Sequence, residues 1–224
     1  DPVRRGEIQA AGLGMAVEAW DSNGKSVVGE KGELVCTQPF PSMPVGFWND
    51  ADGKRYQGAY FDHFTDRGHD VWHHGDFIEI TPSGGVRVYG RSDATLNPGG
   101  VRIGTAEIYR TLESMDPIED SLAVGYRERG DESIVLFVKL TATTACDDAL
   151  KDEIKKLIRQ QLSPRHVPRW IRPVNDIPYT RSGKKVEIAV REAIHGQTPA
   201  NLRALANPSA MDEYMSMGGF DDES

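Results

Sequence analysis

The pattern of the sequence changes at Asp93, and this change constrains the fold more than any other feature. Upstream of Asp93, residues 15–20 show the short alternation of apolar and polar residues that is typical of a strand. Residues 77–80 and 86–89 flank a Gly-rich loop, which predicts a β-hairpin. We therefore expect residues 1–92 to be β-rich throughout, in the form of a small barrel-like subdomain.

Downstream of Asp93, helical and strand patterns mix. Apolar residues recur at helical spacing in 108–115 and again in 150–162, just before Pro164. The apolar runs at 122–124 and 133–140 predict strands that are joined by a polar turn. This mixture predicts a small α+β domain.

These patterns give three segments. The chain of 224 residues allows one or two domains, and a Gly-rich stretch near Asp93 permits the backbone torsions that a hinge needs. The end of the chain is rich in Gly, Met and Asp, so we expect it to be disordered. The expected division is 1–92, 93–196 and 197–224.

Composition limits the cellular setting. At 38% hydrophobic and 27% charged residues the chain is typical of a globular protein, and it contains no apolar run of the roughly 18 residues that a membrane span requires. Cys36 and Cys146 are far apart and in no metal-binding spacing, which fits unpaired thiols in a reducing compartment. The sequence begins with Asp1 rather than Met. We expect a cytoplasmic protein without a membrane partner, of which this chain is a part.

Charge is unevenly spread along the chain. The net charge is −8, yet residues 151–191 hold 11 Lys and Arg residues against 4 Asp and Glu residues. A basic stretch in an acidic protein favours small anionic ligands over nucleic acid.

A histidine-rich segment is the one pattern that suggests a metal. Imidazoles and carboxylates are ligands for divalent ions, but the segment has no Cys partners and no regular scaffold. We therefore expect no metal site, and a zinc-binding β domain is kept only as a third interpretation. The residues concerned are His63, His69, His73 and His74, with Asp62, Asp66 and Asp70 among them.

Three further stretches are informative, at 72–76, 90–108 and 178–185. Each has an ordinary explanation when it is taken alone. A Gly-Asp pair before a strand is a common turn, a Gly-Thr pair followed by Glu107 is a plausible helix start, and a Gly-Lys pair is a flexible basic loop.

Taken together, the three stretches resemble the adenylate-forming superfamily of acyl-CoA synthetases, luciferases and peptide-synthetase adenylation domains. The resemblance rests on Gly-Asp, then Gly-Arg-x-Asp followed by Gly-x-Arg-Ile and Glu-Ile, then Pro-x-Thr-x-x-Gly-Lys. The usual Thr of Thr-Gly-Asp is His74 here, which places the chain nearer the short-chain synthetases. Over its wider sequence the chain most resembles the members that activate acetoacetate. The resemblance covers about residues 1–208. It implies that the phosphate loop and the adenine pocket belong to a preceding N-terminal domain, so the chain alone is not expected to catalyse adenylation.

The resemblance implies roles in the reaction with ATP. Asp76 matches the ribose-binding Asp of the family and Arg91 matches a second ribose contact. Arg102 matches a residue near the departing phosphates. Lys184 matches the catalytic Lys, whose compact ammonium group neutralises the α-phosphate while the carboxylate attacks it.

Further roles concern CoA and motion. Gly100 matches the Gly that the pantetheine arm of CoA passes, and Arg159 matches a contact to the nucleotide phosphates of CoA. Asp93 matches the hinge about which the C-terminal domain rotates between the two half-reactions.

The implied function is therefore ligation of acetoacetate to CoA through an acetoacetyl-adenylate, with ATP, CoA and Mg²⁺ as cofactors. Two alternatives remain open from the sequence. One is a synthetase for another short acid, such as acetate or propionate. The other is a non-catalytic module that binds nucleotide or CoA.

Overall fold

The chain forms two compact units, residues 1–93 and 94–224. The computed structural model describes residues 2–67, 71–128, 130–199, 202–217 and 219–220. The sequence analysis placed the division between residues 92 and 93. Across the described residues, none of the helices has both the length and the apolar character to cross a membrane.

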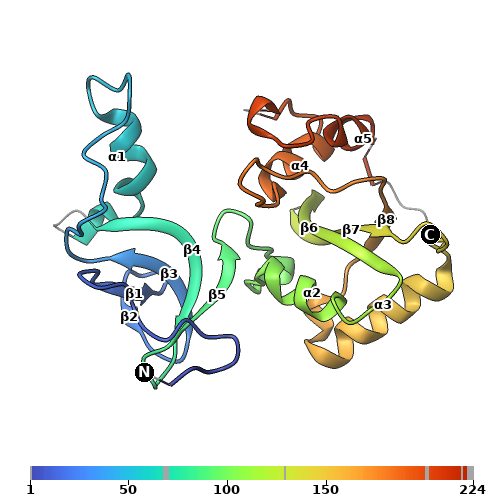
Figure 1. Ribbon diagram of the computed structural model, residues 1–224, viewed down its shortest axis with the longest axis horizontal. Helices are drawn as coiled ribbons and strands as arrows, with labels where there is room; N and C mark the ends of the chain where they lie inside the picture. The colour runs from blue at the N-terminus through green and yellow to red at the C-terminus, as the bar shows by residue number, and fades with distance from the viewer. Residues whose placement is uncertain (1, 68–70, 129, 200–201, 218, 221–224) are drawn as a thin grey trace. The chain divides into compact units, whose positions relative to one another are not determined.

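The first unit is built on one five-stranded antiparallel sheet with the strand order β2-β1-β3-β4-β5 (Figure 1). The predicted β-rich unit is confirmed. Within the described part of the chain the two edge strands, β2 and β5, do not pair with each other, so the sheet is open and does not close into a barrel. The strands are β1 (Val17–Trp20), β2 (Ser26–Val27), β3 (Lys31–Cys36), β4 (Trp72–Ile80) and β5 (Val86–Arg91).

The predicted hairpin is confirmed as β4 and β5. Thr81 closes its loop, because the Thr81 N–H donates to the Gly85 carbonyl at 2.8 Å and the Thr81 hydroxyl accepts from the Gly85 N–H at 3.1 Å. Ile78 and Val86 are buried and pack with Ala19 of β1. The hairpin therefore has one face on a small core, as the alternation of its sequence requires.

The first unit is not all-β. Helix α1 (Lys54–Tyr60) and the 3₁₀ helix η1 (Asp62–Arg67) lie between β3 and β4. Helix α1 is short and has no amphipathic pattern, which is why its sequence did not predict it. The Asp50 carboxylate accepts from the Tyr56 N–H at 2.8 Å, and Tyr60 stacks on Trp72 with ring centroids 3.7 Å apart. Tertiary stacking thus stabilises a helix that local propensity would not.

The second unit is an α+β domain, as predicted. Its three-stranded sheet has the order β6-β7-β8, with β6 and β7 antiparallel and β7 and β8 parallel (Figure 1). Its elements are η2 (Pro98–Gly100), α2 (Thr105–Leu112), β6 (Ile118–Glu128), β7 (Asp131–Leu140), α3 (Asp148–Gln161), η3 (Pro164–His166), β8 (Trp170–Pro173), α4 (Glu187–Ile194), η4 (Leu202–Ala204) and α5 (Ala210–Ser216).

Strand β7 is the centre of this unit, because both of its faces are buried. Leu136 and Val138 face a core that contains residues of α2 and α3. Val135 and Phe137 face a second core that contains residues of α4 and α5. The continuous apolar run of β7 is what a strand covered by helices on both faces needs.

The prediction of a disordered tail is wrong for residues 202–217 and 219–220. Met211 and Tyr214 of α5 are fully buried, and Phe220 is buried beside them. The Tyr214 hydroxyl donates to the Asp176 carbonyl at 3.0 Å. This segment is mostly polar, but it contains a few widely spaced apolar residues that cover one face of the β6-β7-β8 sheet.

This packing predicts that Tyr214→Ala destabilises the second unit by about 3–5 kcal/mol, because it leaves a cavity against Phe137. Native-state hydrogen exchange of the β7 amides measures this loss. The matched control is the neighbouring Met215→Ala, whose side chain is exposed and which is expected to change stability by no more than about 0.5 kcal/mol. Equal protection of β7 in the two variants would contradict the docking of α5.

Candidate active site

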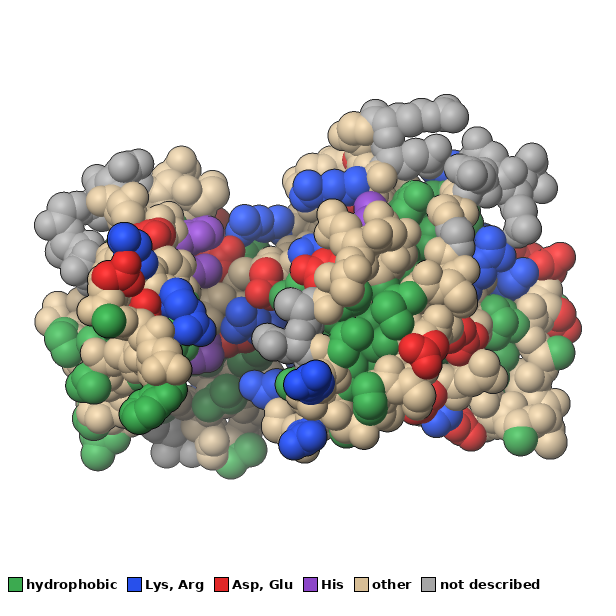
Figure 2. Space-filling model, turned by 90° about the horizontal axis from the view of Figure 1, so that it is seen from above, with side chains coloured by type: hydrophobic (Ala, Val, Ile, Leu, Met, Phe, Trp, Pro, Cys, Tyr) green, Lys and Arg blue, Asp and Glu red, His purple; other side chains and the backbone are tan. Residues whose placement is uncertain are grey.

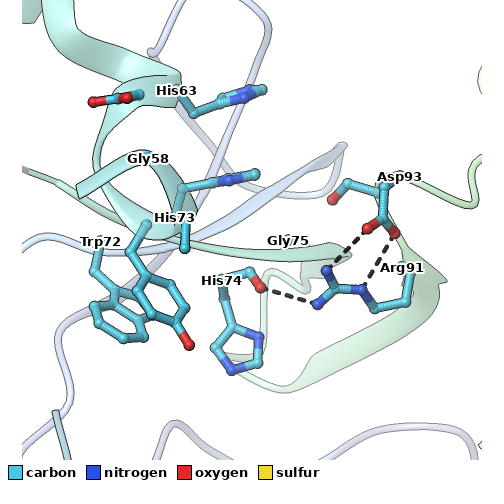
Figure 3. A pocket seen from close by; sticks show the side chains of 12 residues that line it. Gly58, His63, Trp72, His73, His74, Gly75, Arg91 and Asp93 are labelled. Atoms are coloured by element: carbon cyan, nitrogen blue, oxygen red, sulfur yellow. Dashed lines mark hydrogen bonds and ion pairs between the residues drawn. The ribbon is translucent and has the colours of Figure 1, made fainter. Parts of the chain in front are cut away.

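A hollow of about 650 Å³ opens on the first unit. Its walls come from α1, η1, the start of β4 and the end of β5, and they carry His63, His73, His74 and Arg91 (Figure 3). The hollow therefore holds most of the polar residues that the sequence analysis singled out in this unit.

Arg91 is held against strand β4 by a glycine. Its guanidinium group donates to the His74 carbonyl at 3.1 Å (Figure 3). Gly75 has a φ of 80°, and a Cβ atom there would lie only 2.7 Å from Arg91 Nη2. Only glycine tolerates both the torsion and the close approach. This is the physical reason for a glycine before Asp76.

Asp76 and Arg91 face each other across the hairpin. They are paired residues in the register of β4 and β5, and the charge of Asp76 contributes to the raised pKa of Arg91. The Asp76 carboxylate is also bonded by the His74 ring. The structure thus brings together the two side chains that were predicted to bind ribose.

Arg91 also contacts Asp93, the predicted hinge residue, through two hydrogen bonds of 3.3 and 3.1 Å. Burial lowers the pKa of Arg91, but the hydrogen bonds and charge of Asp93 outweigh this and raise it, so Arg91 remains a cation. Any change in the backbone at Asp93 must therefore change this pair.

Lys184 lies at the end of a tight turn in the second unit. The Thr180 N–H donates to the Lys184 carbonyl at 2.8 Å, and the Thr180 hydroxyl accepts from the Lys184 N–H at 3.0 Å. Gly183 supplies the positive φ of 77° that the turn requires. The Lys184 side chain is exposed.

Gly100 and Arg102 share a second loop, which the bridge between Leu96 and Ile103 closes. Acidic side chains fix this loop by its backbone, since the Asn97 N–H donates to Glu132 at 2.6 Å and the Gly99 N–H donates to Asp131 at 3.1 Å. Backbone N–H groups of Glu132 and Gly99 hold the pKa of the Asp131 carboxyl below its ordinary value.

There is space beside Gly100. A Cβ atom added to Gly100 would have no heavy atom within 4 Å, and a hollow of about 370 Å³ adjoins it. Packing within the second unit therefore does not require glycine at this position. Its φ of 81° does, and the space is open to a ligand.

Arg159 is exposed in the last turn of α3. Helix α3 covers the face of the sheet opposite α4, whereas the turn of Lys184 leads into α4. No contact among the described residues joins Arg159 to Lys184 or Gly100. The three residues predicted to act on CoA and the α-phosphate thus lie on three separate segments.

Comparison with known proteins shows what this chain is similar to. The sequence model of the AMP-binding enzyme C-terminal domain matches residues 107–184. Acetoacetyl-coenzyme A synthetase of Rhizobium meliloti is 56% identical over 216 residues, covering 96% of this chain and 33% of the relative. Over nearly its whole length, the chain is therefore similar to about a third of an acetoacetyl-CoA synthetase.

Two further relatives show the same similarity. Acetoacetyl-CoA synthetase of Xenopus tropicalis is 49% identical over 218 residues, covering 96% of this chain and 32% of the relative. The solved acetoacetyl-CoA synthetase of Streptomyces lividans superimposes with a TM-score of 0.86 at 43% identity, covering 96% of this chain and 32% of that one. The chain spans about a third of the length of these synthetases.

The sequence analysis assigned no role to Lys185, the neighbour of Lys184, but the folded chain gives it one. Its ammonium group donates to Asp120 at 2.6 Å and to the Ser121 carbonyl, and it lies 4.1 Å from the ring centre of Tyr109. The Tyr179 hydroxyl donates to the same Asp120 carboxylate. The two residues that bracket the turn are thus tied to β6, and only the contacts of the folded chain reveal it.

We expect Lys185→Met to lower the local free energy of unfolding at the 179–185 turn by about 2 kcal/mol, because Asp120 loses a charge-assisted hydrogen bond. Hydrogen exchange of the turn amides measures this. Lys184→Met is the matched control, since its exposed side chain should change stability by no more than about 0.5 kcal/mol. If both variants behave alike, Lys185 does not anchor the turn.

Proposed function

We propose that this chain is the part of an ATP-dependent acetoacetate–CoA ligase that carries the ribose contacts, the catalytic lysine and the CoA-facing loop. Two observations carry the proposal: the first unit pairs Asp76 with Arg91 across β4 and β5, and the second unit presents an exposed Lys184 on an anchored turn. A nucleotide needs both an acceptor for its ribose hydroxyls and a cation for its α-phosphate.

In the first half-reaction, a carboxylate oxygen of the acid attacks the α-phosphorus of ATP and the bond to pyrophosphate breaks. The products are acetoacetyl-adenylate and pyrophosphate. The Asp76 carboxylate accepts hydrogen bonds from the ribose hydroxyls, which positions the nucleotide. Arg91 is held by the His74 carbonyl and Asp93 and supplies a fixed donor beside it.

Lys184 brings a positive charge to the place where two anions must meet. Its ammonium group stabilises the negative charge that grows on the α-phosphate and orients the attacking carboxylate. Arg102 lies on the loop of Gly100 and contacts the departing phosphates. Mg²⁺ accompanies ATP and is held mainly by the phosphate oxygens, so this chain need not supply its ligands.

In the second half-reaction, the thiol of CoA attacks the acyl carbon of the adenylate, and AMP leaves with the electrons of the broken mixed-anhydride bond. The space beside Gly100 admits the pantetheine arm, and Arg159 contacts the CoA phosphates. Because Lys184 and Gly100 lie on different loops of one unit, rotation about Asp93 presents each in turn to the same adenylate. We place the reaction in the cytoplasm, where ATP and CoA are available.

The choice of acetoacetate rests on the relatives. Relatives that are 43–56% identical over nearly the whole chain are named acetoacetyl-CoA synthetases. No described residue is assigned to the pocket for the acid, so the acid has to be tested directly.

The test measures AMP release by the full-length protein with ATP, Mg²⁺ and CoA, comparing acetoacetate, acetate and propionate. We expect acetoacetate to give the highest kcat/KM. Lys184→Ala is expected to lower the rate by about 100-fold or more, because one charge that stabilises the transition state is lost.

Each outcome separates the candidates. A preference for acetate or propionate would retain the mechanism and reassign the acid. A folded protein that binds nucleotide or CoA but releases no AMP with any acid would replace the ligase with a non-catalytic binding module.

Gly100→Ala should slow the CoA-dependent half-reaction by about tenfold or more, because a methyl group and a strained φ displace the thiol path. Stopped-flow measurement of thioester formation checks this, and adenylate formation should be unchanged. Gly196→Ala is the matched control, since Gly196 also has a positive φ and no heavy atom within 4 Å of an added Cβ atom. Equal thioester rates in the two variants would remove Gly100 from the CoA path.

A further inference from the structure

Three side chains with metal-binding atoms meet at the hollow of the first unit, although they are far apart in the sequence. Glu33 comes from β3, His63 from η1 and His73 from β4. Their nearest ligand atoms all lie within 4.8 Å of one another. Two of the four histidines weighed in the sequence analysis thus come together, with a carboxylate that the sequence did not indicate. His74 lies outside this group, and His69 and Asp70, with the side chain of Asp66, lie outside the described residues.

The two imidazole rings are already arranged side by side. Their centroids are 4.0 Å apart and their planes differ by 8°, so the rings lie one above the other (Figure 3). Small rotations about the side-chain torsions turn such a parallel pair toward one point. A zinc ion needs nitrogen atoms at about 2.0–2.1 Å from it, so binding requires movements that bring the ligand atoms closer together than the present limit of 4.8 Å.

Glu33 supplies a negative charge that is hidden from water. The residue is 2% exposed, and its Oε2 atom accepts from the Ser92 hydroxyl and lies 3.1 Å from His73 Nε2. A buried carboxylate is costly unless a partner compensates its charge. A divalent ion at this point would place a positive charge directly beside the carboxylate.

The kind of ligand selects the kind of ion. Two imidazoles and one carboxylate on one side of an ion suit zinc and similar first-row transition metals, whereas Mg²⁺ prefers an all-oxygen shell. His63 is exposed and histidine side chains of the first unit reach its surface, so water can complete the coordination (Figure 2). The Ser92 hydroxyl holds the carboxylate in place, as groups around metal ligands commonly do.

We propose that Glu33, His63 and His73 form a binding site for one divalent transition-metal ion of the zinc type. The ion replaces the contact between His73 and Glu33, and it binds the neutral rings through nitrogen lone pairs. This site is separate from the Mg²⁺ that accompanies ATP, and it does not depend on the proposed ligase activity. His63 and His73 line the same hollow as Arg91, and His73 is on β4, the strand that carries Asp76.

The test titrates chelator-treated full-length protein with Co²⁺ and follows its visible absorption, then displaces Co²⁺ with Zn²⁺. We expect one equivalent of Co²⁺ to give the intense bands of a low-coordinate site. His63→Gln and His73→Gln should each weaken binding by about 10- to 100-fold or more. His74→Gln is the matched control from the same hollow and should bind as the wild type does.

His63 is the decisive variant, because its side chain is exposed and its loss does not disturb the core, whereas Glu33→Gln removes a buried charge and can perturb folding. Unchanged circular dichroism establishes that His63→Gln is folded. If folded His63→Gln and His73→Gln bind Co²⁺ as the wild type does, or if His74→Gln loses binding to the same extent, the site does not exist as proposed.

Discussion

The contact on which the site of the first unit depends is the packing of the Arg91 guanidinium against Gly75. It fixes a cation at the end of β5, beside the carboxylate of Asp76 and in hydrogen-bonding contact with Asp93. A side chain at position 75 would meet the guanidinium and push it away from β4. The hairpin, the candidate ribose site and the end of the first unit are therefore linked through one glycine.

In the second unit, the proposed functional residues lie on exposed surface loops, and these loops are held in fixed positions. Strand β7 is buried on both faces and gives the unit a rigid centre. Two polar anchors then fix the loops at its surface. Lys185 and Tyr179 share Asp120 beneath the turn of Lys184, while Glu132 and Asp131 hold the backbone beside Gly100. If the exposed side chains on these loops act as proposed, this support matters, because positioning accounts for much of the effect of a catalytic group.

The sequence predicted those parts of the fold that local pattern determines. The β4–β5 hairpin and helices α2 and α3 follow from alternation, helical spacing and turn residues, and motif order pointed to Asp76, Arg91 and Lys184. What it missed depends on distant contacts. Helix α1 is stabilised by stacking of Tyr60 on Trp72, and helix α5 by a few apolar residues in a polar segment.

The same limit applies to the candidate sites. Glu33 is 40 residues from His73, and Asp120 is 65 residues from Lys185, so no local spacing relates the members of either group. Conversely, the histidine-rich segment looked like one possible site by composition, and among its described residues the fold brings His63 and His73 together beside Glu33. Motifs therefore indicated the candidate reactive groups, whereas contacts formed on folding determine the groups that hold them in place.

The central claim is that Lys184 serves the first half-reaction and the Gly100 loop serves the second. It is tested most directly by giving preformed acetoacetyl-adenylate and CoA to full-length Lys184→Ala protein and measuring thioester formation. The account predicts a rate close to that of the wild type, although the same variant makes almost no adenylate from ATP. A thioester rate that falls as far as the adenylation rate would contradict the division of labour between the two loops.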